Sequence, residues 1–199
     1  PLNTGVNVTV EMNWEVKFPE ISRVRMGKYS DSTIFIAYWY PQMSVYDDLQ
    51  GWDEQNFTMN QEFYNNFADF DVKITAPEGF LIWATGELQN PAEVYSDEIL
   101  KSFEKAKTSD EIVKIVTKET KNSLKTQKGK NTFYYKAKYV PDFAFGAAID
   151  AVTTNKDLVP RKSIAQCYFF SCNLLMCLIF VYMCCDCVHT GCTVLVTEV

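Results

Sequence analysis

The chain has 199 residues, of which 15% are aromatic and 22% are charged. This length and composition are sufficient for one globular domain with a hydrophobic core, and they exclude a wholly disordered chain. The formal net charge of -6 argues against a nucleic-acid partner, because phosphate binding needs a clustered excess of Lys and Arg. The most lysine-rich stretch, residues 121–130, is predicted to be a solvated loop.

The composition changes abruptly towards the end of the chain. All seven cysteines lie within the last 33 residues, and all 19 Lys and Arg precede Ser163. We therefore predict a β domain over residues 1–150, a linker over 151–162 and a Cys-rich apolar tail over 163–199. The first residues lack an initiator Met and a signal-peptide pattern, so we expect a fragment.

Two stretches of the first 40 residues have the pattern of β-strands. From Val6 to Phe18, apolar and polar residues alternate, which predicts a long strand with one buried face. From Thr33 to Tyr40, β-branched and aromatic residues are denser, which predicts a strand buried on both faces. Pro41 is expected to end this strand, because proline cannot donate a ladder hydrogen bond.

The next two stretches predict a β-hairpin. Phe70–Ala76 alternates with Val72 and Ile74 on one face, and Phe80–Leu88 is again rich in strand-forming residues. The intervening Pro77–Gly79 has the composition of a turn, so we expect the two strands to pair with each other.

Further along, Thr132–Val140 predicts another strand and Phe143–Phe145 begins a short one. Between the hairpin and these strands, Asn90 followed by Pro91 predicts a helix start, and Thr108 predicts a second one. The expected fold is therefore mainly β, an antiparallel sandwich or saddle-shaped sheet with a short helical insertion over about residues 91–118.

The chain offers few groups for catalysis. Its one histidine is His189, whereas a zinc peptidase site needs two His one helical turn apart with a Glu between them. The acidic pairs Asp47-Asp48, Asp53-Glu54 and Asp69/Asp71 are interpreted as loop and turn residues rather than as acid–base or cation sites.

The aromatic clusters follow the same logic. Tyr38-Trp39-Tyr40 and Phe63-Tyr64 are interpreted as packing residues rather than as stacking surfaces for a sugar. We accordingly predict no catalytic, cofactor-binding or metal-binding residue in this chain.

Five blocks together resemble one family. They are, in chain order, Tyr38–Asp48, Gly51–Asp53, Glu62–Val72, Ala84–Asn90 and Val140–Phe145. In this order and spacing they are similar to the N-terminal β domain of bacterial zinc metallopeptidases of the aminopeptidase N (gluzincin) type. The resemblance covers about residues 6–145 and ends at Gly146.

The resemblance implies a supporting rather than a catalytic role. In that family the zinc, its His and Glu ligands and the substrate-anchoring Gly-x-Met-x-Asn stretch belong to a catalytic domain that follows the β domain. None of these motifs occurs here, so no family site residue is carried onto this sequence. The implied partners are that missing catalytic domain and, only through it, a peptide substrate. The implied cofactor is zinc in the full-length enzyme, and the implied location is the cell envelope or the secreted fraction.

The tail admits three interpretations. Residues 163–185 carry no charge, and this stretch is long enough for a transmembrane segment. Alternatively, Cys184, Cys185, Cys187, His189 and Cys192 offer soft metal ligands, although paired Cys-x-x-Cys spacing is missing. Third, the simultaneous change in cysteine content, basic residues and family likeness indicates a frameshifted or misjoined translation. The main hypothesis is a β domain to which the tail contributes nothing. The alternative, in which the tail spans a membrane, is a β-sandwich binding module with a C-terminal membrane anchor.

Overall fold

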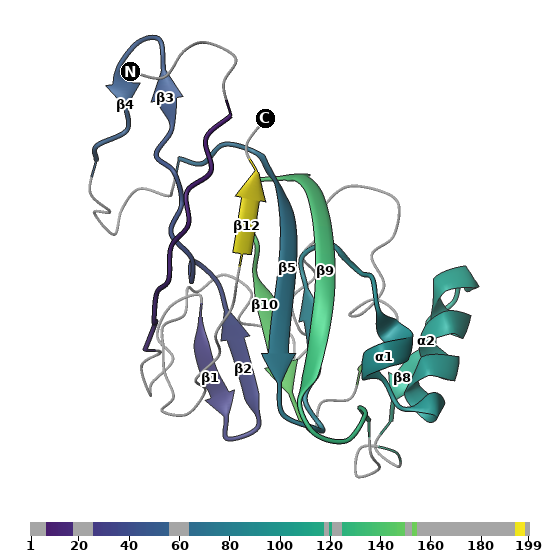
Figure 1. Ribbon diagram of the computed structural model, residues 1–199. Coiled ribbons are helices and arrows are strands. Elements are labelled where there is room, and N and C mark those ends of the chain that lie inside the picture. Colours follow the sequence, from purple (N-terminus) through teal and green to yellow (C-terminus); the bar gives the residue numbers. More distant parts are fainter. Residues whose placement is uncertain are drawn as a thin grey trace.

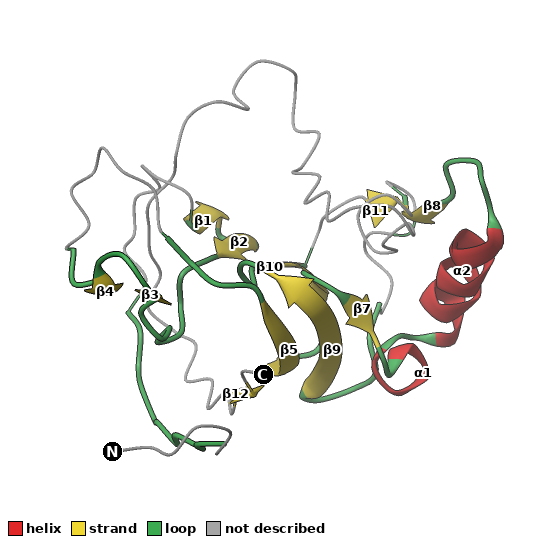
Figure 2. Ribbon diagram, turned by 90° about the horizontal axis from the view of Figure 1, so that it is seen from above, coloured by secondary structure: helices red, strands yellow, loops and turns green. Residues whose placement is uncertain are grey.

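The computed structural model describes residues 7–17, 26–55, 64–117, 120, 125–149, 153–154 and 194–197. These residues form a mainly β structure built on two four-stranded antiparallel sheets, with two helices at one side (Figures 1 and 2). The mainly β, antiparallel architecture with a helical insertion is the one that the sequence predicts.

The first sheet has the strand order β1-β2-β10-β6. Its strands are β1 (Gly27–Ser30), β2 (Thr33–Ile36), β6 (Leu81–Ala84) and β10 (Phe145–Ala148). The second sheet has the order β12-β5-β9-β7. Its strands are β5 (Ala68–Ala76), β7 (Glu87–Leu88), β9 (Asn131–Val140) and β12 (Val194–Thr197).

Two small ribbons complete the strand content of the described residues. One pairs β3 (Tyr46–Asp47) with β4 (Gly51–Trp52), and the other pairs β8 (Lys114–Val116) with β11 (Thr153–Thr154). In Figure 1 the β3–β4 ribbon lies away from the two sheets, on the side opposite the helices.

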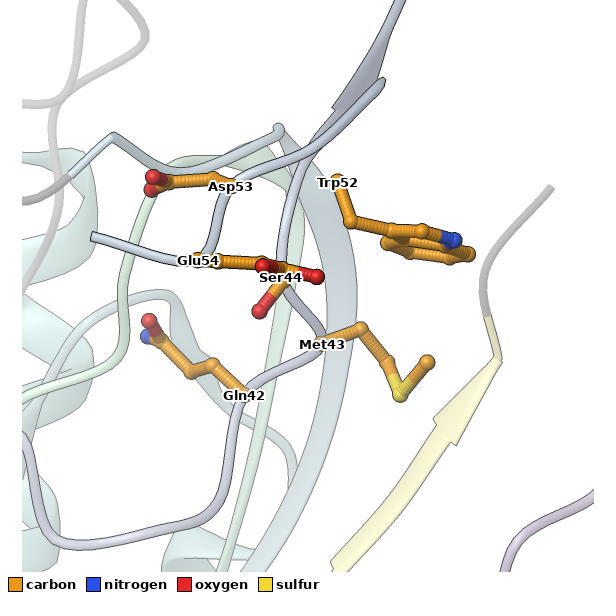
Figure 3. A pocket seen from close by; sticks show the side chains of 6 residues that line it. All are labelled: Gln42, Met43, Ser44, Trp52, Asp53 and Glu54. Carbon is orange, nitrogen blue, oxygen red and sulfur yellow. The ribbon is translucent and has the colours of Figure 1, made fainter. Parts of the chain in front are cut away.

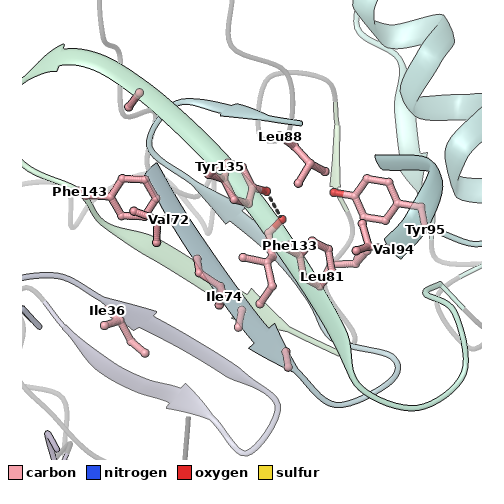
Figure 4. Packing of buried hydrophobic residues seen from close by; sticks show 14 of the residues in the cluster. Ile36, Val72, Ile74, Leu81, Leu88, Val94, Tyr95, Phe133, Tyr135 and Phe143 are labelled. Atoms are coloured by element: carbon pink, nitrogen blue, oxygen red, sulfur yellow. Dashed lines mark hydrogen bonds between the residues drawn. The ribbon is translucent and has the colours of Figure 1, made fainter. Parts of the chain in front are cut away.

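The hydrophobic core lies between the two sheets (Figure 4). Leu81 and Ile82 of the first sheet and Val72 and Phe133 of the second are at most 1% exposed. The sheets are also joined by a hydrogen bond, in which the buried Tyr135 hydroxyl donates to the Ile82 carbonyl at 2.8 Å. This bond satisfies a polar group that would otherwise be buried without a partner.

The facing predicted for β5 is confirmed. Phe70, Val72 and Ile74 are buried, whereas the alternate residues Asp71 and Lys73 are partly or fully exposed. Continuous pairing with β9 from Phe70 to Ala76 fixes this register. A slip by one residue would turn the apolar set towards water.

The predicted hairpin is wrong in its pairing. Pro77–Gly79 does turn the chain, and Gly79 adopts a φ of +85° that suits glycine. However, β6 pairs with β10 rather than with β5, because β5 has β9 on one side and β12 on the other. The turn therefore carries the chain from one sheet to the other.

The strand predicted from Val6 to Phe18 is also wrong where the structure describes it. Residues 7–17 include no strand, and Val8 and Val10 are 54% and 59% exposed. An alternating pattern orients side chains but supplies no ladder partner, and no described strand pairs with this segment. Its contact with the core is Trp14, whose indole Nε1 donates to the Trp39 carbonyl at 2.8 Å.

The strand predicted from Thr33 to Tyr40 ends earlier than expected. β2 stops at Ile36, and its first three residues are only partly buried, so it is not buried on both faces. Tyr38 has a φ of +51°, which breaks the extended conformation before Pro41 is reached. Trp39 and Tyr40 are nevertheless buried, as packing residues beyond the strand.

The helical insertion begins where predicted but is shorter. α1 covers Pro91–Val94 and α2 covers Asp97–Thr108, with Ile99 and Phe103 buried. The predicted second helix start at Thr108 is wrong, because α2 ends there and the following residues lead into β8. The β-branched run that fills β8 favours a strand over a helix.

The lysine-rich stretch is not wholly a solvated loop. Lys125 and Thr126 are 3% and 0% exposed, and the Lys125 ammonium donates to the Ile149 carbonyl. Residues 121–124 lie outside the described part of the chain, and residues 127–130 are exposed as predicted. Burial of Lys125 follows from its hydrogen-bonded partner, since an unpaired buried ammonium is costly.

Substitution at two adjacent positions of β5 tests its register. Ile74→Asp should unfold the protein, because burial of Ile74 contributes about 1.5–3 kcal/mol and a buried carboxylate adds a further penalty. Lys73→Glu, on the exposed face, should change the free energy of unfolding by about 1 kcal/mol or less. Urea denaturation followed by circular dichroism measures both. A sensitive Lys73 beside a tolerant Ile74 would show that the register is wrong.

Candidate functional site

A shallow, open hollow lies beside the β3–β4 ribbon (Figure 3). This open hollow has a volume of about 450 Å³. We refer to it as the ribbon hollow, and its lining residues are Gln42, Met43, Ser44, Trp52, Asp53 and Glu54.

A short turn shapes the ribbon. The Asp47 carboxylate accepts the backbone N–H groups of Leu49 and Gln50 at 2.9 and 2.6 Å, which is the geometry by which Asp stabilises a turn. Gly51 follows with a φ of +77°. The rings of Tyr46 and Trp52 then pack edge to face, with centroids 5.2 Å apart.

The two sides of the hollow are tied to each other by the backbone. The Asp53 N–H donates to the Val45 carbonyl at 2.8 Å, and Val45 is buried. The Asp53 carboxylate accepts the Gln55 N–H at 3.2 Å. The side chains of Met43, Ser44, Trp52 and Glu54 remain exposed on this frame.

A hydrogen-bond network holds Gln42 at the rim. Its side-chain amide donates to the Tyr40 hydroxyl at 2.6 Å and to Asp142 Oδ1 at 3.2 Å. The Tyr40 hydroxyl also donates to Asp142 Oδ1, at 2.8 Å. Asp142 therefore positions a residue that lies 100 positions earlier in the chain.

Burial sets the charges in this network. Burial raises the pKa of the Asp142 carboxyl, against the opposing effect of the hydrogen bonds from Tyr40 and the Phe143 N–H. Burial and the neighbouring Asp142 carboxylate also raise the pKa of Tyr40, which therefore keeps its proton.

The hollow presents acceptors and apolar surface. Ser44, Asp53 and Glu54 supply oxygen atoms, and Met43 and Trp52 are each 54% exposed. The six lining residues include no His or Cys. Among the residues that the structure describes, no group of three or more His, Cys, Asp or Glu is arranged to hold a metal ion.

The acidic pair Asp69/Asp71 has partners within the domain. Asp69 accepts the Tyr139 N–H at 2.8 Å, and Asp71 accepts the Tyr134 hydroxyl at 2.7 Å. Lys136 forms an ion pair with Asp71 at 3.2 Å. Both residues lie in strand β5 rather than in a loop or turn, so that part of the interpretation is wrong for this pair.

Of the other residues that the sequence analysis singles out, some lie within the described part of the chain and some lie outside it. Tyr64 is 57% exposed, so it is not a core residue, and Phe63 lies outside the described part. His189, the seven cysteines and residues 163–185 also lie outside it. Within the described ranges, no helix is both long and apolar enough to cross a membrane.

Sequence reasoning missed the ribbon and the network behind it. A turn signal for the ribbon is present in Asp47 to Gly51, where two acids precede a glycine at short range. The pairing of Gln42 with Asp142 has no local signal. Only their presence in or beside two resembling blocks connects them.

Comparison of the chain with known protein families, curated proteins and solved structures gives no match.

The raised pKa of Asp142 predicts a pH dependence of stability. A carboxyl whose pKa is higher in the folded state favours folding when protonated, and this contribution is lost as pH rises through the folded pKa. Asp142→Asn cannot ionise, so above about pH 4, the ordinary Asp value, it should gain stability relative to the unsubstituted chain. Urea denaturation across pH 3–8 measures the difference in the free energy of unfolding. This range extends to about one unit or more on each side of the ordinary pKa of an Asp carboxyl.

A second acidic residue provides a control of opposite sign. Burial would raise the pKa of Asp71, but the hydrogen bonds from Tyr134 and Lys136 and the charges of Lys136 and Lys73 together lower it. Its contribution is therefore present at neutral pH and lost as pH falls, and Asp71→Asn should be destabilising mainly at neutral pH. If the free energies of unfolding of Asp142→Asn and the unsubstituted chain differ by the same amount at every pH, the raised pKa assigned to Asp142 would be contradicted.

Proposed function

We propose that residues 1–150 form a non-catalytic N-terminal β domain of a zinc metallopeptidase of the aminopeptidase type, which supports and partly walls the active site of a separate catalytic domain. The observation that carries the proposal is the convergence of the five resembling blocks. If the five blocks resemble the family through common descent, they should contact one another in the folded domain. Matches that arise by chance are not expected to do so.

Three of the blocks meet through aromatic side chains. Tyr40 of the first block contacts Phe70 of the third, with ring centroids 5.6 Å apart. Phe70 in turn lies 5.7 Å from Phe143 of the last block. All three rings are buried.

The other two blocks join the same region through the backbone. The Thr85 N–H donates to the Ala144 carbonyl at 2.9 Å, and the Ala144 N–H donates to Thr85 Oγ1 at 3.2 Å. Asp53 is bonded to Val45, which places its block beside the first one. Each of the five blocks therefore contacts at least one other block.

The exposed surface of the hollow fits the role of a wall. An exposed Trp and Met beside polar acceptors is a composition favoured at interfaces, where aromatic residues and Met are enriched. Zinc and its ligands, the general base and the peptide substrate would all belong to the catalytic domain. This chain should therefore be inactive by itself, since it lacks the His-Glu-x-x-His site.

The alternative is a β-sandwich binding module with a membrane anchor at residues 163–185. Its support is the absence of charge in that stretch. A single span would place residues 194–197 across about 30 Å of hydrocarbon from the domain. In the structure, these residues form β12 and pair with β5 of the domain, which does not fit a single span between them.

The open reading frame in the source DNA tests the proposal. We expect that correcting one base between the codons for Gly146 and Ser163 restores a frame that continues into a His-Glu-x-x-His motif. The reason is that the family likeness ends at Gly146 and the composition changes by Ser163. Resequencing both strands of the source DNA makes the measurement. A stop directly after Val199, with no such motif in any downstream frame, would contradict the proposal and favour the anchored module.

A further inference from the structure

The outer edge of β5 carries a strand from the far end of the chain. β12 pairs antiparallel with β5 in a continuous register that runs from Val194 opposite Val72 to Thr197 opposite Asp69. Figure 1 shows β12 beside β5, at the end of the sheet. Strand addition at a sheet edge is a common way for a protein to bind an extended peptide.

This edge is built without β12. β5 pairs with β9 in continuous register from Phe70 to Ala76, including Val72 with Tyr135 and Ile74 with Phe133. Phe70 and Val72 are also anchored in the core, at 5% and 0% exposed. The backbone of β5 is therefore held by its other neighbours, whereas β12 has β5 as its one strand neighbour in the sheet order.

We propose that the edge of β5 from Asp69 to Val72 is a binding site for an extended peptide, which joins the sheet as an antiparallel strand. In this chain the C-terminal strand β12 occupies the site as a tethered ligand. The residues that receive the peptide belong to the β domain, so the proposal does not rest on the function proposed above.

The residues of β5 define the kind of peptide. Positions of the ligand opposite Phe70 and Val72 share the buried face of the sheet, and therefore favour apolar side chains. Positions opposite Asp69 and Asp71 share the outer face, where an opposite charge is favourable. Asp71 is already paired with Lys136, so Asp69 contributes most to this preference. The expected ligand alternates apolar with basic or neutral polar residues.

A peptide supplied in trans tests the site in the full-length chain. The probe is a fluorescein-labelled peptide with the sequence of residues 193–199, Thr-Val-Leu-Val-Thr-Glu-Val. The test variant is Val194→Pro with Val196→Pro, because proline lacks the N–H that a ladder needs. The matched control places the same change outside β12, as Val188→Pro with Thr190→Pro.

Fluorescence anisotropy should show that the test variant binds the peptide roughly tenfold or more tightly than the unsubstituted chain, since tethering gives the native strand an effective concentration on the order of 1 mM. The control variant should behave like the unsubstituted chain. Equal affinity for all three chains, or no binding by the test variant while it keeps a cooperative urea transition, would overturn the proposal.

Hydrogen exchange keeps the proposal testable if the proline variant does not fold. In the unsubstituted chain, excess unlabelled peptide should increase amide exchange in residues 194–197 without changing exchange in β9. A peptide with Lys at the position of Leu195, opposite Asp71, or at that of Thr197, opposite Asp69, should displace the strand at lower concentration than one with Asp there. Unchanged exchange in residues 194–197 with every peptide would overturn the proposal.

Discussion

The contact on which the two sheets depend is the burial of Phe143 between them. Phe143 is 0% exposed and follows β9 of the second sheet directly before β10 of the first. Its ring lies against Phe70, and its carbonyl accepts the Trp39 indole N–H at 3.1 Å. Phe143 therefore packs on the second sheet through Phe70 and is bonded to the segment that follows β2 of the first sheet, at the point where the chain crosses between the two.

The same point organises the candidate site. Asp142 accepts the Phe143 N–H at 2.7 Å and also holds Tyr40 and Gln42. The rim of the ribbon hollow is therefore positioned from the interior of the sandwich. Packing between the sheets and the geometry of the exposed surface are thus two consequences of one short segment, Pro141 to Phe143.

The sequence predicts which side chains of a strand are buried better than it predicts which strands pair with each other. Alternation predicts the buried face of β5 correctly, because a period of two is a property of the strand itself. It does not specify which strand lies alongside, since β6 and β12 reach their neighbours from distant parts of the chain. The same limitation of the pattern applies to residues 7–17, which alternate like a strand but belong to no strand of the described sheets.

The candidate site shows the same division. Trp39 and Tyr40 were predicted as packing residues from their composition, and both are buried. The network that links Gln42 to Asp142 joins residues that no periodicity or spacing connects. Its members lie in or beside resembling blocks, so the resemblance was the one signal that pointed to that region. The proposed role in a zinc peptidase likewise depends on this signal and on the convergence of the blocks.

The most direct measurement of the account is the effect of Phe143→Ala on the cooperativity of unfolding, with the exposed Phe67→Ala as a matched control. We predict that Phe143→Ala lowers the free energy of unfolding by about 3–5 kcal/mol. Both sheets should then lose their protection from hydrogen exchange together. Phe67→Ala should cost about 1 kcal/mol or less. A loss for Phe143→Ala as small as that of the control, or exchange that opens one sheet while the other keeps its protection, would contradict the claim that this residue joins the two sheets.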